Sequence, residues 1–163
     1  FNIRPITAKD NAKIKELIES VLIEFGATGG GFASSDPELK AMSEFYNQEN
    51  KFYFVIENSD GDVVGGAGIA PLKGGSGQTC ELQKMYFLPE IRGHGLGFKI
   101  IRLCLDKAKQ QGFQFCYLET LDHMTAAQSL YRKVGFKKVP EPMGETGHFG
   151  CNSFFLLDFN QYS

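Results

Sequence analysis

The sequence is most informative over residues 81–97, which read ELQKMYFLPEIRGHGLG. A mostly apolar strand pattern is followed by a loop with glycine at positions 93, 95 and 97, and then by a helical pattern. Glycine lets the backbone bend sharply, so that several N–H groups can converge on one point. The positive end of the next helix and the charge of Arg92 would attract an anion. The loop therefore predicts a phosphate or pyrophosphate site, while a glycine-rich turn without a ligand stays open.

Two common phosphate-binding motifs do not fit this loop. A P-loop ends in Gly-Lys-Ser/Thr, whereas Gly97 is followed by Phe98-Lys99-Ile100. The dinucleotide fingerprint needs Gly-x-Gly-x-x-Gly, but the spacing here is Gly-x-Gly-x-Gly, in mid-chain and after a run of strands. Another class of phosphate-bearing ligand is therefore expected.

Apolar periodicity predicts alternating helices and strands on either side of this loop. Helices are expected over residues 7–25, 37–46, 97–111 and 127–134, and strands over 3–5, 52–56, 63–70, 80–88, 115–120 and 154–159. The helix 97–111 lies between two strands and predicts one parallel βαβ unit in a mixed α/β fold. With a regular pleat, Glu81, Gln83, Met85 and Phe87 would share one face of their strand.

Composition predicts one globular domain over residues 1–163. Hydrophobic residues make up 42% and charged residues 22%, and the net charge of −2 argues against sequence-independent nucleic-acid binding. The sequence shows neither a membrane-spanning apolar run nor a signal-peptide pattern at its start, so we expect a cytoplasmic protein without a membrane partner. Its cysteines form no Cys-x-x-Cys pair and are expected to be reduced core residues: Cys80, Cys104, Cys116 and Cys151.

Two motifs together resemble the GNAT superfamily of N-acetyltransferases. Arg92, Gly95 and Gly97 match that family's Arg/Gln-x-x-Gly-x-Gly/Ala loop, and residues 127–136, AQSLYRKVGF, match its Ala-x-x-Leu-Tyr-x-Lys-x-Gly-Phe helix. The predicted order of elements agrees with the family over essentially the whole chain. The resemblance implies a central mixed, twisted sheet of about six to seven strands flanked by about four helices.

The resemblance also implies acetyl-CoA as co-substrate, lying where two parallel strands splay apart. The pyrophosphate would bind the N–H groups of residues 93–98, and the pantetheine arm would pair with the backbone near Met85 and Phe87. Lys133 would reach a phosphate or remain an exposed helix charge. The implied cofactor-binding residues are Met85, Tyr86, Phe87, Arg92, Gly93, His94, Gly95, Leu96, Gly97, Phe98 and Lys133.

Two catalytic residues follow from the same resemblance. Tyr131 would be the general acid that protonates the departing thiolate, although its apolar helical stripe is equally typical of a core tyrosine. Glu81 would be the general base, directly or through water, or else a solvated or ion-paired strand carboxylate. Many family members have Asn where this chain has Met124, and Thr125 could replace that contact by capping the helix.

The acceptor side is the least determined by sequence. The family fold places it near residues 26–33, 119–122 and 147–151, and the candidate substrate-binding residues are Phe32, Gln83, Glu119, His148 and Cys151. His148 and Cys151 could form a nucleophilic pair or a metal site, but no third orienting group or further ligand is evident. We expect a pocket wall and no metal.

The predicted function is direct transfer of the acetyl group from acetyl-CoA to a primary amine of a small molecule or amino-acid-like acceptor. Two alternatives stay open: acetylation of a protein lysine or N-terminus, and a CoA-binding sensor or inactive homologue. An open acidic groove would favour a protein acceptor, whereas a closed pocket would favour a small one. The sequence leaves a homodimer open.

Overall fold

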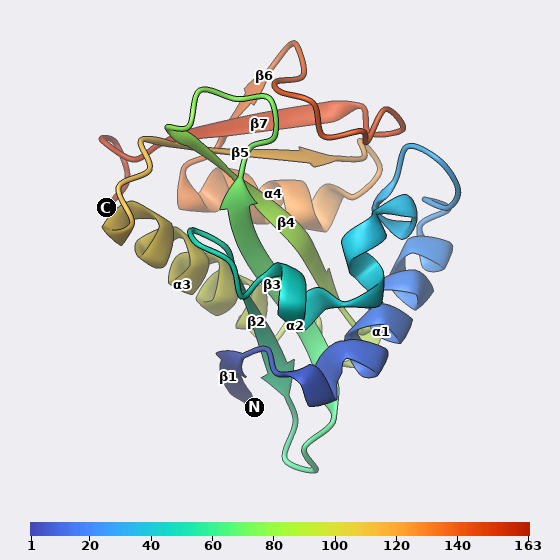
Figure 1. The fold of residues 1–163 in the computed structure, drawn as a ribbon. Coiled ribbons are helices and arrows are strands. Elements are labelled where there is room, and N and C mark those ends of the chain that lie inside the picture. The colour runs from blue at the N-terminus through green and yellow to red at the C-terminus, as the bar shows by residue number, and fades with distance from the viewer.

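A computed structural model describes all 163 residues and shows one seven-stranded mixed sheet (Figure 1). The strand order is β1-β2-β3-β4-β5-β7-β6, and every neighbouring pair is antiparallel except β4 and β5. The strands are Asn2–Pro5 (β1), Phe52–Glu57 (β2), Val63–Pro71 (β3), Thr79–Phe87 (β4), Phe115–Thr120 (β5), Lys137–Val139 (β6) and Ser153–Asp158 (β7). The predicted mixed α/β fold is confirmed, including the parallel βαβ unit formed by β4, α3 and β5.

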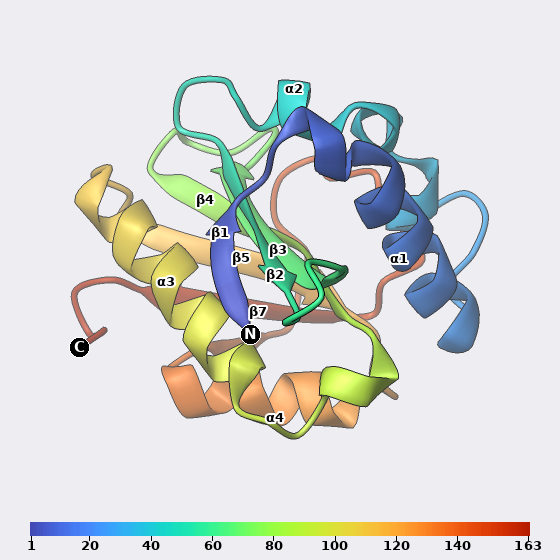
Figure 2. The same ribbon diagram turned by 90° about the horizontal axis from the view of Figure 1, so that it is seen from below.

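Four α-helices flank the sheet: Asn11–Glu24 (α1), Met42–Phe45 (α2), Leu96–Gln110 (α3) and Thr125–Val134 (α4). Seen from below in Figure 2, α1 and α2 lie on one side of the sheet and α3 and α4 on the other. Each side buries its own apolar cluster, one around Ile14, Ile18 and Met42 and the other around Ile100 and Leu105. The sheet is therefore covered on both faces, and its strands are apolar with little alternation.

The N-terminal helices differ from the predicted ones in their boundaries. A 3₁₀ turn, Ala8–Asp10, precedes α1, and the Asp10 carboxylate accepts the Thr7 N–H at 2.8 Å. The helix expected over 37–46 is divided into a 3₁₀ turn, Pro37–Lys40, and the short α2, because Ala41 leaves the helical region with φ −147° and ψ 60°. The short strand β6 was not predicted, since its three residues carry no periodicity.

Strand β4 contains a bulge that changes which side chains share a face. Gly68 pairs with Gln83 and Gly66 with Tyr86, so Lys84 and Met85 together oppose a single residue of β3. Lys84 adopts φ +51°, and its carbonyl accepts a 2.7 Å hydrogen bond from the Tyr53 hydroxyl. A buried tyrosine from β2 therefore supports the bulge through a hydrogen bond.

The prediction of one shared face for Glu81, Gln83, Met85 and Phe87 is consequently wrong. Beyond the bulge, Met85 and Phe87 pack against the cluster that also holds Leu82, on the α3 side. Gln83 instead contacts Tyr46 on the α1 side, with its Oε1 accepting the tyrosine hydroxyl at 2.7 Å. The bulge thus separates the strand into an upstream part that carries polar groups and a downstream part that carries apolar ones.

Three of the four cysteines are fully buried and unpaired, as expected: Cys80, Cys104 and Cys116. Cys151 is only half-buried and lies in a loop near the carboxyl end of β5. No helix has both the length and the apolar composition needed to cross a lipid bilayer.

Candidate active site

A cleft of about 400 Å³ lies between the downstream half of β4, the glycine loop and the N-terminal ends of α3 and α4. It contains ten of the eleven residues implied to contact the cofactor: Met85, Tyr86, Phe87, Arg92, Gly93, Gly95, Leu96, Gly97, Phe98 and Lys133. Two helix N-termini therefore border one cavity, where their unpaired N–H groups and dipoles favour a negatively charged ligand.

The glycine loop presents a continuous set of free backbone donors. None of the N–H groups from Gly93 to Phe98 has an acceptor in the protein, and the first N–H of α3 to be bonded is that of Lys99, to Gly95 O. Gly93 and Gly95 have φ of +81° and +77°, a region that L side chains rarely adopt. A Cβ atom at either position would meet no heavy atom within 4 Å, so the loop faces open space. These features fit a pyrophosphate bound by main-chain amides.

The side chains of Arg92 and His94 form hydrogen bonds within the protein. The Arg92 guanidinium pairs with both carboxylate oxygens of Glu24 at 2.6 and 2.8 Å and also donates to Phe87 O. Arg92 thus ties the end of α1 to the end of β4. His94 does not line the cleft, and its Nδ1 lies 3.1 Å from the carbonyls of Ile91 and Arg92.

Lys133 lines the cleft from α4, and its Nζ lies 4.8 Å from the centre of the Phe98 ring. Met124 occupies the N-cap position of α4 without a side-chain cap, and Thr125 makes no capping hydrogen bond either. The expected replacement of the family asparagine by Thr125 is therefore not observed.

A second, smaller cavity of about 70 Å³ adjoins the cleft, and Met85, Tyr86 and Met124 line both. It brings together both predicted catalytic residues and all five candidate substrate-binding residues: Glu81, Tyr131, Phe32, Gln83, Glu119, His148 and Cys151. These side chains come from β4, β5, α4 and the two loops that precede α2 and β7. We call this cavity the acceptor pocket.

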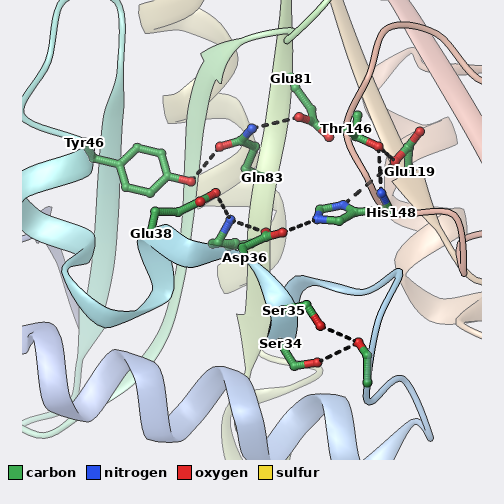
Figure 3. Close-up of polar contacts among 12 residues, drawn as sticks. Ser34, Ser35, Asp36, Glu38, Tyr46, Glu81, Gln83, Glu119, Thr146 and His148 are labelled. Atoms are coloured by element: carbon green, nitrogen blue, oxygen red, sulfur yellow. Dashed lines mark hydrogen bonds and ion pairs between the residues drawn. The ribbon is translucent and has the colours of Figure 1, made fainter.

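Glu81 is a buried carboxylate at the inner end of this pocket, with 5% of its surface exposed. Its Oε1 accepts the Gln83 amide at 2.7 Å, and Gln83 in turn accepts the Tyr46 hydroxyl, as Figure 3 shows. Burial raises the pKa of Glu81 to about 7, partly opposed by the Gln83 hydrogen bond. The group is therefore poised to exchange a proton near neutral pH.

Tyr131 reaches the pocket from the buried face of α4. Its ring packs against Phe136 and Phe155, and Gly135 ends the helix with φ +115°. The Tyr131 hydroxyl makes no hydrogen bond within the protein, and burial raises its pKa above the usual range. The hydroxyl keeps its proton and has it free to donate into the cavity.

A network that sequence analysis missed supports the opposite wall. Lys84 is buried and donates to Asp36 Oδ2 at 2.8 Å and to Glu38 Oε1 at 3.0 Å, while His148 Nε2 lies 2.7 Å from Asp36 Oδ1 (Figure 3). Although burial opposes the charged imidazole, the hydrogen bond to Asp36 raises the pKa of His148. A lysine in the middle of a strand expected to be buried was the available signal, because a buried ammonium requires acidic partners.

The two loops that carry this network also contact each other. The Gly150 N–H donates to Gly31 O at 3.0 Å, and a Cβ atom at Gly31 would lie 2.7 Å from the Phe149 ring. Glycine is required there for close approach, and the paired loops contribute Phe32, His148 and Cys151 to the lining of the acceptor pocket.

Cys151 and His148 do not form a nucleophilic pair. Their only hydrogen bond joins the Cys151 N–H to His148 O, and burial raises the pKa of the Cys151 thiol to about 12. A thiol attacks as its thiolate, which this environment disfavours. The Nδ1 of His148 instead faces Glu119 at 3.8 Å, and Glu119 accepts the Tyr117 hydroxyl at 2.6 Å.

Comparisons with known proteins agree with this geometry. Residues 16–136 match the acetyltransferase (GNAT) family. The chain is similar to YjgM of Escherichia coli, described as an uncharacterized N-acetyltransferase, with 43% identity covering 96% of this chain and 93% of that protein. An uncharacterized N-acetyltransferase of Schizosaccharomyces pombe is 30% identical, covering 79% of this chain and 77% of that protein.

Solved structures resemble the fold. A GNAT-family acetyltransferase of Staphylococcus aureus superimposes with a TM-score of 0.85 at 21% identity, covering 96% of this chain and 98% of that one. The putative acetyltransferase yncA of Salmonella typhimurium, determined with its cofactor acetyl-CoA, has a TM-score of 0.74 at 22% identity, covering 99% and 95%.

Proposed function

This chain belongs to the GNAT family of acetyltransferases, and we propose that it transfers the acetyl group of acetyl-CoA directly to the primary amine of a small molecule. Acetyl-CoA-dependent N-acetyl transfer is the activity of the family. The direct route, the small acceptor and the residue roles below are the proposed parts.

The proposal rests on one observation: the cleft and the acceptor pocket adjoin and share lining residues. A phosphate-binding loop borders the cleft, Glu81 and Tyr131 line the acceptor pocket, and Met85, Tyr86 and Met124 belong to both. A thioester whose pyrophosphate lies on the glycine loop would therefore extend along β4 toward the two catalytic candidates. The free N–H groups from Gly93 to Phe98 would hold the phosphates, and Lys133 would add a positive charge.

Glu81 is proposed to be the general base. An amine attacks only in its neutral form, and removing the proton of a lysine-like amine at pH 7 costs about 4.6 kcal/mol. A base works best when its pKa lies near the operating pH, and burial gives Glu81 a pKa of about 7. The hydrogen bond from Gln83 fixes the carboxylate in position.

Tyr131 is proposed to protonate the sulfur as the carbon–sulfur bond breaks. Its hydroxyl lines the pocket, has no competing hydrogen bond and remains protonated before the reaction. After the bond to the acetyl carbon forms, the nitrogen still carries one extra proton. This proton restores the hydroxyl of Tyr131. Direct transfer is supported by the protonated Cys151 thiol, which offers no second nucleophile.

A small acceptor is supported by the small volume of the acceptor pocket. The cavity holds about 70 Å³ and is bordered by the paired loops around Gly31 and Gly150. A protein lysine or N-terminus would need an open groove at this point. The alternative of an inactive CoA-binding protein is disfavoured because both candidate catalytic groups line one cavity.

The Tyr131→Phe variant tests the proposal. We expect kcat to fall roughly 100-fold or more, a typical loss for a general acid, with unchanged acetyl-CoA affinity by calorimetry. Tyr162→Phe is the matched control, because Tyr162 is also buried but donates to Asp106 far from the pocket. Wild-type turnover in Tyr131→Phe would remove the assignment of Tyr131.

A further inference from the structure

The acceptor pocket has an excess of negative charge. Glu81 of β4 and Glu119 of β5 both turn inward, and their side chains are almost fully buried. Their ligand-forming oxygens and a nitrogen of His148 all lie within 4.8 Å of one another. Two carboxylates at this distance repel each other unless a cation lies between or beside them.

The cations near this pair are already engaged. Lys84 holds Asp36 and Glu38, and His148 is shared between Asp36 Oδ1 at 2.7 Å and Glu119 Oε1 at 3.8 Å. When Glu81 is ionised and His148 is protonated, the group contains four carboxylates, Asp36, Glu38, Glu81 and Glu119, against two cations. No arginine lines the pocket, and its remaining wall is mostly apolar, with Phe32, Leu118 and Leu121 among the lining residues.

These charges discriminate between two kinds of small amine. An ammonium group placed near Glu81 and Glu119 would balance the excess charge, and an alkyl chain would pack on the apolar wall. A carboxylate carried on the same small acceptor would find neither a free cation nor a free guanidinium. It would be desolvated beside like charges, which is costly.

Building on the proposed function, we infer that the acceptor is a small primary alkylammonium without a carboxylate, and that Glu119 determines this specificity. Glu81 takes one proton from the ammonium, and the neutral nitrogen then forms its bond to the acetyl carbon. The carbon–sulfur bond breaks, and the sulfur leaves as the thiol after accepting a proton from Tyr131. The nitrogen of the new amide then loses its remaining extra proton, which restores the Tyr131 hydroxyl. Glu119 keeps the cationic substrate in place.

A matched acceptor series tests this inference in the intact enzyme. The series consists of n-propylamine, β-alanine and β-alaninamide, which share the reacting amine and differ in whether a carboxylate is present. Turnover is followed as thiol release from acetyl-CoA. We expect kcat/KM for β-alanine to be at least about tenfold below that for propylamine, with most of the loss recovered in the amide.

The outcomes separate this inference from the proposed function. If β-alanine reacts as well as propylamine, the inference is wrong and the proposed small-amine transfer stands. If acetyl-CoA binds but neither this series nor its butyl and pentyl homologues react, the small-amine function fails and the inference fails with it.

Glu119→Gln sharpens the test, because the amide can still accept the Tyr117 hydroxyl. We expect it to raise KM for propylamine about tenfold and to narrow the gap to β-alanine, with unchanged acetyl-CoA affinity. If Glu119 had a merely structural role, the substitution would lower kcat/KM for both acceptors equally and leave the ratio of the two values unchanged. If this variant does not fold, the acceptor series in the wild-type enzyme still tests the inference.

Discussion

The two adjoining cavities are built in opposite ways. The cleft beside the glycine loop offers a ligand the free main-chain donors of one contiguous segment, Gly93 to Phe98, and these donors need no particular side chain. The acceptor pocket is made by side chains from segments as far apart as Asp36 and His148, which are 112 residues apart in the chain. A local backbone site can serve one unchanging ligand, whereas a pocket of distant side chains can change its chemistry by substitution.

This difference predicts that the acceptor pocket depends strongly on its buried charges. Lys84→Met should lower the free energy of unfolding by about 3–5 kcal/mol, because Asp36 and Glu38 would lose their shared buried cation. Chemical denaturation at pH 7.5 measures the loss.

Lys15→Met is the control for that variant. Lys15 pairs with Glu19 at the surface of α1, and such pairs contribute only about 0.3–0.5 kcal/mol. Equal losses in the two variants would mean that the Lys84 network does not hold the pocket together.

Glu81 should make the same pocket sensitive to pH. Its pKa rises from 4.5 in the unfolded chain to about 7 in the folded one, so the folded state binds the proton more tightly. Wild-type stability should therefore fall, relative to Glu81→Gln, as pH rises from 4.5 to 7, by about 3 kcal/mol in total. Denaturation of both proteins at pH 4.5 and pH 8 measures the change.

Catalysis should show the opposite trend, because the base works as its carboxylate. Below pH 7, kcat/KM should decrease about tenfold per pH unit, and Glu81→Gln should remove both the activity and this slope. A constant stability difference between the two proteins across this range would contradict the assigned titration.

The cofactor cleft should respond to shape and local charge instead. Gly95→Asp introduces a carboxylate where the phosphates are expected, and should weaken acetyl-CoA binding about 100-fold by calorimetry. Gly77→Asp has the same left-handed strain, with φ +84° and no atom within 4 Å of a Cβ, but lies in the β3–β4 turn. Similar binding losses in both variants would assign the effect to strain and not to the loop.

The same contrast explains how much the sequence could predict. The glycine loop, α3 and the Tyr131 helix are local features with strong periodic or glycine signals, so their positions were predicted to within a few residues. The mixed sheet followed from the order of these elements. Cysteines 80, 104 and 116 were placed in the core because small apolar residues on predicted buried faces have few alternatives.

The features that were missed depend on contacts between distant segments. The bulge at Lys84 is fixed by Tyr53 from another strand, and a lysine gives no local signal for a positive φ. Asp36 stands at the N-cap position before Pro37, but its carboxylate makes no capping hydrogen bond and instead binds Lys84 and His148. The Arg92 pair with Glu24 likewise joins elements that no local pattern connects.

The parallel pairing of β4 with β5 stops at Glu81 and Tyr117, while β4 continues to Phe87. Beyond that point, β4 and β5 are not paired with each other, although both lie in the interior of the sheet. A pantetheine arm lying between these strands would act as a temporary strand, and the stabilisation would grow with the logarithm of the ligand concentration above its Kd. The purified enzyme should therefore become more resistant to proteolysis as the acetyl-CoA concentration rises.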